Sequence, residues 1–295
     1  MDHAPATIDH LVLPVRDLDL ARARYEALGF RVAAEARHPF GTENACIFLQ
    51  DGTYLEPLGI ADRTLAEIET RKGNPFLRRD QAYRFRVDDE GFSMLAMRSD
   101  DAAADLASFV KQGFGFGQLF PFSRMAKTLD GEIEIGVKLG FAADDRAPDA
   151  AFFACERINM EPLWSADRTA HENGVTGLSA VLLSEENPTD FQYLLQAATG
   201  MRDFASSSNG LSFHMDGADL FCFTPVALQQ LFAIPSARTE RGVRFEGAVF
   251  TCQSIASLTS RYAAAGIDCF VHLGRLIVPA APGQGVPFVF EEAAS

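Results

Sequence analysis

One pattern of elements returns four times along the chain, and no other feature constrains the fold as much. The first copy has a strand, "IDHLVLPVRD", an amphipathic helix, "LDLARARYEALGF", and three strand-like runs, "RVAAEAR", "NACIFLQD" and "TYLEPLG". Later copies begin at "GFSMLAMRSD", "VTGLSAVLLS" and "RFEGAVFTC". The helices of copies one, three and four end at Gly29, Gly200 and Gly266, residues typical of a helix stop. Each copy is therefore predicted to be one β-α-β-β-β module.

Two polar connectors separate the modules and indicate the domain organisation. The connector between modules one and two, "ADRTLAEIETRKGNPFLRRDQAYRFRVDDE", is helix-prone and predicted to lie on the surface. The connector between modules two and three, "NMEPLWSADRTAHENG", is rich in polar and turn residues and is the candidate domain boundary. We predict a first domain over residues 1–165 and a second over 166–295. His171 and Asn173 in this connector are expected to have a structural role at the start of the next strand.

Charge and composition exclude several classes of function. The 295 residues are 47% hydrophobic and carry a net charge of -14, which argues against nucleic acid or an anionic membrane as partner. No apolar run approaches the roughly 20 residues of a membrane-spanning helix, and the N-terminus lacks the features of a secretory signal, so we expect a cytoplasmic protein. The five cysteines are scattered and without a C-x-x-C pair, which predicts reduced, mostly buried thiols.

Two polar residues interrupt otherwise apolar strands of the first module. His10 lies in "TIDHLVLPV" and Glu56 in "TYLEPLG". A buried charge is costly unless it is paired, hydrogen-bonded or bound to a metal, so each residue needs a partner. Tyr54 is two residues before Glu56, which predicts that the phenol and the carboxylate share one face of the strand. The alternative is a hydrogen-bonded histidine at a strand edge and a structural ion pair of Glu56 with Arg124 or Arg157.

Several longer motifs resemble the glyoxalase-like branch of the vicinal oxygen chelate superfamily, which includes glyoxalases, extradiol dioxygenases and bleomycin-resistance proteins. They are "HPFGTENACIFLQDGTYLEPLG" and "AAFFACERINMEPLWSADRTAHENG", similar to the branch's H-P-x-x-G-T-x-N before Y-L-E and its F-F-x-C-Q-H before H-x-N-G. The resemblance covers modules one and two, and modules three and four by pattern only. It implies an α+β fold of four tandem β-α-β-β-β modules, paired into two cup-shaped mixed-sheet domains.

The resemblance also implies metal ligands on the first and last strands of a module, where His10 and Glu56 lie. Both types of side chain suit one divalent ion such as Zn, Mn, Fe or Ni. Glu156 and Arg157 stand where the branch has Gln and His, and only one of them can face the cup because neighbouring strand residues point to opposite sides. Glu156 is the candidate third ligand and a candidate catalytic residue beside Glu56, whereas Arg157 is a candidate substrate contact. Ser93 aligns with the ligand position of module two and is a poor ligand.

Other residues match positions that line the cup in the branch. His38, Thr42 and Asn44 belong to the H-P-x-x-G-T-x-N match and are predicted to line the mouth and contact substrate, although turn chemistry alone favours such residues. Tyr54 and Arg124 complete the predicted substrate contacts, with Arg124 suited to a carboxylate or enolate or, alternatively, to neutralising Glu156. Modules three and four lack matching histidines and carboxylates, which predicts a metal-free second domain.

These residues leave two functional readings open. The first is a metal-dependent lyase or isomerase in which the ion stabilises an oxyanion or enolate of a small organic molecule while Glu56 or Glu156 moves a proton. The second is a metal-free protein that sequesters a small molecule, like the bleomycin-resistance proteins. An extradiol dioxygenase is disfavoured because its iron ligands belong to the second half. Fused modules can complete a cup within one chain, so a monomer and a homodimer both agree with the sequence.

Overall fold

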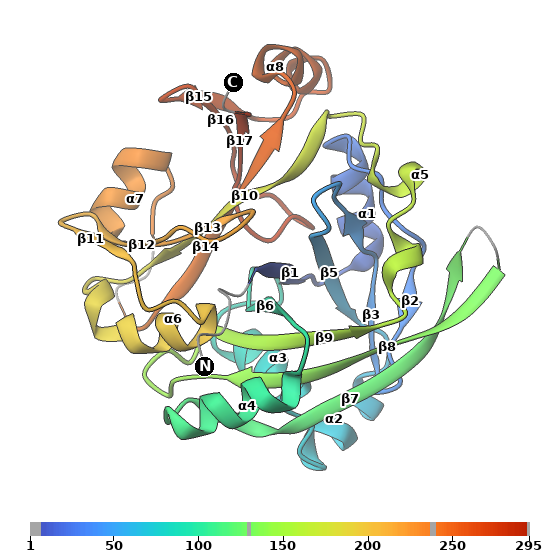
Figure 1. The fold of residues 1–295 in the computed structure, drawn as a ribbon. Helices are drawn as coiled ribbons and strands as arrows, with labels where there is room; N and C mark the ends of the chain where they lie inside the picture. Colours follow the sequence, from blue (N-terminus) through green and yellow to red (C-terminus); the bar gives the residue numbers. More distant parts are fainter. Residues whose placement is uncertain (1–6, 129–130, 237–239, 294–295) are drawn as a thin grey trace.

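Two curved mixed sheets, each with helices on both faces, form the molecule (Figure 1). The structure is a computed structural model, and it describes residues 7–128, 131–236 and 240–293. The sheets use residues from 8 to 158 and from 175 to 292, so each holds two of the four modules. The predicted α+β fold of two cup-shaped domains is confirmed. The predicted boundary near residue 165 lies in the segment that joins the sheets, and independent folding of the two parts stays a prediction.

The first sheet has nine strands and the order β2-β3-β5-β1-β6-β9-β8-β7, with β4 paired to β5. In each module the first strand pairs in parallel with the last, β1 with β5 and β6 with β9, and the two modules meet where β1 runs antiparallel to β6. The strands are β1 (Ile8–Pro14), β2 (Ala36–Arg37), β3 (Thr42–Asn44), β4 (Ile47–Phe48), β5 (Tyr54–Ile60), β6 (Met94–Ser99), β7 (Gly115–Thr128), β8 (Gly131–Ala142) and β9 (Ala151–Ile158).

The second sheet repeats this arrangement with eight strands in the order β11-β12-β13-β10-β14-β17-β16-β15. Here β10 pairs in parallel with β13 and β14 with β17, while β10 and β14 run antiparallel. The strands are β10 (Val175–Ser184), β11 (Ala205–Ser207), β12 (Gly210–Phe213), β13 (Asp219–Phe223), β14 (Arg244–Cys252), β15 (Phe270–His272), β16 (Arg275–Val278) and β17 (Phe288–Glu292). Both sheets therefore follow from the same module.

Helices occupy two kinds of position relative to the sheets. The module helices are α1 (Leu18–Ala27), α4 (Ala102–Lys111), α6 (Gln192–Thr199), preceded by the short η2 (Pro188–Phe191), and α8 (Ile255–Ala264). The connectors between modules supply α2 (Arg63–Arg71), α3 (Pro75–Arg86) and α7 (Pro225–Phe232), and the segment between the sheets holds η1 (Glu161–Leu163) and α5 (Ala166–Thr169). None of the helices in the described ranges is long and apolar enough to cross a membrane.

Local sequence explains where the module helices begin and end. Asp17, Asp101 and Ser254 each accept a hydrogen bond from a backbone N–H of the first helical turn of α1, α4 and α8. The helix α6 ends at Gly200 with φ of 66°, a left-handed conformation that glycine adopts without steric cost. Gly29, just beyond α1, has φ of 82°, as predicted for a helix stop.

Three apolar clusters divide the interior. The largest contains residues of α1, α4, α6 and α8 together with the outer faces of both sheets, so the two domains share it. The second fills the inside of the first cup and includes Phe76 and Leu77 of α3. The third fills the inside of the second cup, where α7 places Leu228 and Phe232 against the sheet. The connector helices therefore cover the inner faces, and the module helices cover the outer faces.

The predicted strands of module one are shorter than expected. The run "RVAAEAR" forms a strand only at Ala36–Arg37, and "NACIFLQD" is divided between β3 and β4. In modules three and four the structure has the short edge strand β11, and residues 270–278 form the hairpin β15–β16. These differences lie near the sheet edges, where fewer long-range pairings hold a strand in place.

Direct hydrogen bonds hold the two domains together. The Oδ2 atom of Asp51 accepts from the backbone N–H of Leu178 at 2.7 Å, and the Tyr25 hydroxyl donates to the carbonyl of Gln284 at 3.1 Å. The Nδ1 atom of His171 accepts a hydrogen bond from the backbone N–H of Arg31 at 3.0 Å, and its Nε2 atom lies 3.0 Å from the carbonyl oxygen of Phe48. His171 therefore fastens the connector to module one, in agreement with its predicted structural role.

Candidate active site

A cavity opens on the inner face of the first cup. Its walls are mainly aromatic and aliphatic, with a few polar groups among them, the composition usual for a small-molecule site. The polar lining residues are His10, His38, Asn44, Tyr54, Glu56 and Arg124, joined by the thiols Cys46 and Cys155. Six of the nine residues predicted for the site from the sequence are thus among the lining residues, and the other three are Thr42, Arg157 and the outward-facing Glu156.

An irregularity in β1 places a further carboxylate beside His10. Ile8 pairs with Met97 and His10 with Ala96, so Asp9 is an extra residue, as in a β-bulge. A bulge changes the direction in which side chains point. Asp9 is consequently fully buried with its Oδ1 atom 2.6 Å from the Nδ1 atom of His10.

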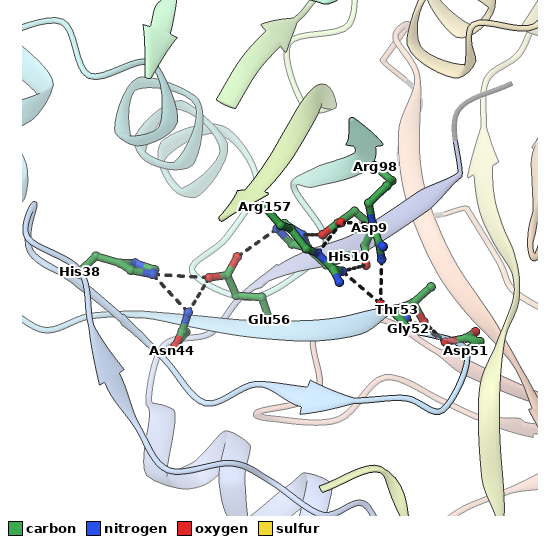
Figure 2. A network of polar contacts seen from close by, with 10 residues as sticks. All are labelled: Asp9, His10, His38, Asn44, Asp51, Gly52, Thr53, Glu56, Arg98 and Arg157. Carbon is green, nitrogen blue, oxygen red and sulfur yellow. Dashed lines mark hydrogen bonds and ion pairs between the residues drawn. The ribbon is translucent and has the colours of Figure 1, made fainter. Parts of the chain in front are cut away.

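Two arginines compensate the charge of Asp9. The Nε atoms of Arg98 and Arg157 each lie 2.7 Å from its Oδ2 atom, and both guanidinium groups also donate to the carbonyl oxygen of Gly52 at 3.0 Å (Figure 2). A buried carboxylate needs such partners because an unpaired charge in the interior is costly. The sequence analysis missed Asp9, although two adjacent polar residues in an apolar strand are a signal for a bulge.

Glu56 lies between the two histidines of the cavity. Its Oε2 atom is 3.5 Å from Nε2 of His10, and its Oε1 atom is 3.8 Å from Nε2 of His38 (Figure 2). His10 comes from β1, Glu56 from β5, and His38 from the turn before β3. The parallel pairing of β1 and β5 places Glu56 opposite Val12. Val12 is two residues after His10, so its side chain is on the same face of β1 as that of His10. The predicted proximity of His10 and Glu56 is therefore present in the structure.

A short hydrogen-bond chain fixes His38 and Glu56 relative to each other. The hydroxyl oxygen of Thr42 lies 2.8 Å from Nδ1 of His38, and the amide nitrogen of Asn44 lies 3.2 Å from Nε2 of His38. The same amide donates to Oε1 of Glu56 at 2.6 Å. Because the amide N–H can only donate, Nε2 of His38 is the acceptor and the proton of the neutral ring is on Nδ1. Thr42 thus acts through His38 and does not line the cavity.

Burial and neighbouring charges separate the pKa values of the two histidines. Burial lowers the pKa of His38 to about 4, so this ring is neutral near pH 7. Burial alone also lowers the pKa of His10, but the contacts with Asp9 and Glu56 outweigh it and raise that pKa above its ordinary value. For Glu56 the effect of burial, which raises the pKa, is outweighed by His10, His38 and Asn44, so its pKa is lowered. The cavity therefore holds an ionised carboxylate between a cationic and a neutral imidazole.

Tyr54 and Arg157 form an aromatic wall next to His10. The Tyr54 ring stacks on the His10 ring with centroids 4.2 Å apart, and Arg157 lies 4.1 Å above the ring of Trp164. As their spacing predicts, Tyr54 and Glu56 both line the cavity. The Tyr54 hydroxyl has no hydrogen-bond partner among the described residues, which leaves it free for a ligand.

Glu156 lies outside this group. Arg157 points toward the inner side, where it contacts Asp9, whereas Glu156 on the other face of β9 pairs with Lys138 at 2.6 Å and accepts from the N–H of Ala102 at 3.2 Å. The alternation of side chains along a strand separates the two residues. Glu156 is consequently not brought near His10 and Glu56, and Arg124 does not neutralise it.

Module two offers no equivalent of the His10–Glu56 pair. Relative to the helix N-caps Asp17 and Asp101, the place of His10 in β1 corresponds to Met94 in β6. The sequence alignment with Ser93 is therefore wrong by one residue, and Ser93 lies on the other side of the strand. Glu56 is in register with Val12, and the same correspondence between the modules relates Val12 to Ala96. Phe153 is in register with Ala96, so Phe153 is the counterpart of Glu56 in module two.

The donor atoms suit a divalent metal ion on the cavity side of His10. A metal-binding histidine usually has its second ring nitrogen bonded to a carboxylate, and Asp9 takes this position on His10. His10 and Glu56 offer an imidazole and a carboxylate, ligand types used for Zn, Fe, Mn and Ni, whereas both ring nitrogens of His38 are engaged by Thr42 and Asn44. Ligand atoms of Asp9, His10 and Cys155 also lie within 4.8 Å of one another. Asp9 is already paired with two arginines there, and burial raises the pKa of the Cys155 thiol well above its usual value.

Comparison with known proteins places the chain in a family. The family model of the glyoxalase-like domain matches residues 8–199, about two thirds of the chain. The chain belongs to the glyoxalase-like domain family. The match includes all of the first cup and ends after α6 in module three, and no curated protein sequence matches the chain.

Solved structures with the same fold cover nearly the whole chain. A hypothetical protein from Staphylococcus aureus has a TM-score of 0.66 at 10% identity, with 97% of this chain and 98% of that chain covered. 4-Hydroxymandelate synthase from Streptomyces coelicolor has 0.60 at 11% identity, with 99% and 95% covered. The 2,3-dioxygenase LapB from Pseudomonas sp. KL28 has 0.57 at 13% identity, with 100% and 94% covered. The predicted vicinal oxygen chelate fold of the glyoxalase-like branch is confirmed, while these identities support the fold alone.

Proposed function

We propose that this glyoxalase-like protein is an enzyme that binds a small organic molecule in the first cup and holds one divalent metal ion with His10 and Glu56. The observation that carries the proposal is the orientation of His10: Asp9 holds Nδ1 at 2.6 Å, and Nε2 is directed toward the carboxylate of Glu56. When bound, the ion would act as a Lewis acid that stabilises an oxyanion or enolate. The reaction class is a lyase or isomerase type.

The residues of the chain divide the remaining tasks among them. Glu56 is the single carboxylate among the residues that line the cavity, so it is the group that accepts or returns a proton. Asn44 fixes the carboxylate through its amide, and Asp9 keeps the His10 ring in one orientation. The Tyr54 hydroxyl and the aromatic wall position the substrate and exclude water. Glu156 is assigned no step because it faces the opposite side of the sheet.

A metal-free binding protein is the second candidate. The observation that favours it is the direct approach of His10 Nε2 to Glu56 Oε2 at 3.5 Å, an ion pair that is complete without a metal. Module two contributes Met94 and Phe153 at the corresponding places, and neither is a usual ligand for these ions. In this case the cavity would sequester a small molecule, and Glu56 would be a polar contact.

Metal content distinguishes the two candidates. We would measure it by mass spectrometry on protein purified without chelator and after incubation with Mn, Fe, Ni or Zn, for the wild type, His10→Ala, Glu56→Gln and Glu156→Gln. The enzyme proposal expects near-stoichiometric metal in the wild type and in Glu156→Gln, and its loss in the other two variants. Glu156→Gln is the matched control because it makes the same chemical change outside the cavity. A wild type that takes up no metal would refute the metal mechanism and leave the binding protein.

A further inference from the structure

The cavity of the first cup continues into a cleft at the open side of the sheet. The strands β2 and β7 are the two edges of this sheet, yet residues of both line the same cleft, together with Arg168 of α5. Cavity and cleft share the lining residues Asn44, Phe48 and Arg124. A molecule longer than the cavity therefore extends into the cleft between the strand edges.

Two guanidinium groups in this cleft lack acidic partners. Arg124 is half-buried on β7, and its one hydrogen bond is a long contact of 3.4 Å to the carbonyl of Met125. Arg168 donates to the carbonyl of Lys127 at 2.6 Å and lies 5.9 Å from the Phe48 ring. Within residues 7–128, 131–236 and 240–293, no carboxylate is at ion-pair distance from either group. Two unmatched positive charges at one opening are unusual in a chain with a net charge of -14.

The two carboxylates of the cleft, Glu35 and Glu132, lie beside other cations. Glu35 lies 3.5 Å from Arg22, and Glu132 is directly opposite Lys127 in the pairing of β7 with β8. The positive charges of Arg124 and Arg168 also act on the Cys46 thiol, although burial is the larger effect and raises its pKa. The cleft is therefore electropositive next to an aromatic cavity.

We propose that the first cup selects an amphipathic organic anion, whose apolar or aromatic body fills the cavity and whose carboxylate or phosphate ester binds Arg124 and Arg168 in the cleft. A guanidinium group binds either anion with two parallel hydrogen bonds. This substrate class rests on the proposed function, since it places the opposite end of the ligand beside His10 and Glu56.

Matched ligands and matched variants test the proposal. We would titrate the full chain by calorimetry with three probes of one body: naphthalene-2-carboxylate, 2-naphthyl phosphate and the neutral naphthalene-2-carboxamide. At least one anion should bind about 10-fold or more tightly than the carboxamide, and Arg124→Gln should weaken that anion by about 10-fold to 100-fold while leaving the carboxamide unchanged. Arg168→Gln, on a separate element, should act in the same direction. Arg37→Gln is the control, because Arg37 lines the cleft but is paired with Glu43 at 3.5 Å.

The outcomes separate this proposal from the metal proposal. Equal affinity for the three probes, no binding of any probe, or equal losses for anion and carboxamide in Arg124→Gln and Arg168→Gln would overturn the anion proposal. The anion that binds the wild type more tightly shows whether the cleft prefers a carboxylate or a phosphate ester. Each titration is repeated with chelator. A preference for the anion that persists there supports the anion proposal even for a protein that takes up no metal.

Discussion

Replacing Asp9 with asparagine should destabilise the first cup by about 3 kcal/mol, because the change removes a charge that three buried or partly buried cations share. Breaking a buried ion pair by removing one partner typically costs about 3–5 kcal/mol. The side chains of His10 and Arg157 are 4% and 10% exposed, so their charges lose a partner that water cannot replace. Arg98 is 38% exposed and contributes little, and asparagine retains part of the hydrogen bonding, which favours the lower end of the range.

The pH dependence of this loss follows from two shifts of opposite sign. The pKa of Asp9 is lowered in the folded protein, where His10 and the two arginines outweigh the effect of burial. Its stabilisation is therefore present above the unfolded value of about 3.9 and lost as the pH falls through the folded value. The pKa of His10 is raised, so its part is present below about 6.5 and lost as the pH rises through the folded value. The difference between wild type and Asp9→Asn should thus be largest between about pH 4 and 6.5.

Urea denaturation followed by tryptophan fluorescence measures this difference. Trp164 is the single tryptophan of the chain and lies against Arg157, so its emission reports the first cup. Asp88→Asn is the control, since Asp88 forms an exposed pair with Arg16 at 3.0 Å and should change stability by less than about 1 kcal/mol. If Asp9→Asn costs no more than this control at pH 5.5, the assignment of Asp9 as the buried counter-ion of His10 is refuted.

Two other perturbations follow from single contacts. Burial lowers the pKa of His38 to about 4, so the free energy of unfolding should fall by roughly 3 kcal/mol as the pH is lowered from 6.5 to 4 and the ring becomes protonated. In His38→Gln the urea midpoint should therefore depend less steeply on pH. Equal slopes in the variant and the wild type would contradict a neutral buried ring. A Cβ atom on Gly177 would lie 2.5 Å from Oδ2 of Asp51, so Gly177→Ala should cost about 1–3 kcal/mol in thermal or urea unfolding. The control Gly59→Ala meets its neighbours at 3.5 Å or more, and an equal loss there would show that close approach is not the cause.

The sequence by itself determined the modules, the ends of their helices and half of the site. Glycine stops act within one or two turns, so Gly29, Gly200 and Gly266 could be recognised locally. Alternation along a strand placed Tyr54 and Glu56 on one face, and the resemblance of the module placed His10 opposite them. These relations depend on residues close in sequence or on a repeated unit, which is why a single sequence was enough.

Only the tertiary structure decided which further groups reach the cavity. The bulge that buries Asp9 depends on the register between β1 and β6. A shift of one residue in the alignment of the two modules decides whether Ser93 or Met94 corresponds to His10. His38 and Asn44, which the family resemblance predicted at the mouth of the cup, meet Glu56 because β3 pairs antiparallel with β5. Arg124 and Arg168 line one cleft because the sheet curls until its two edge strands approach the same opening. Register and curvature are set by pairings between distant segments, and residue spacing along the chain does not contain them.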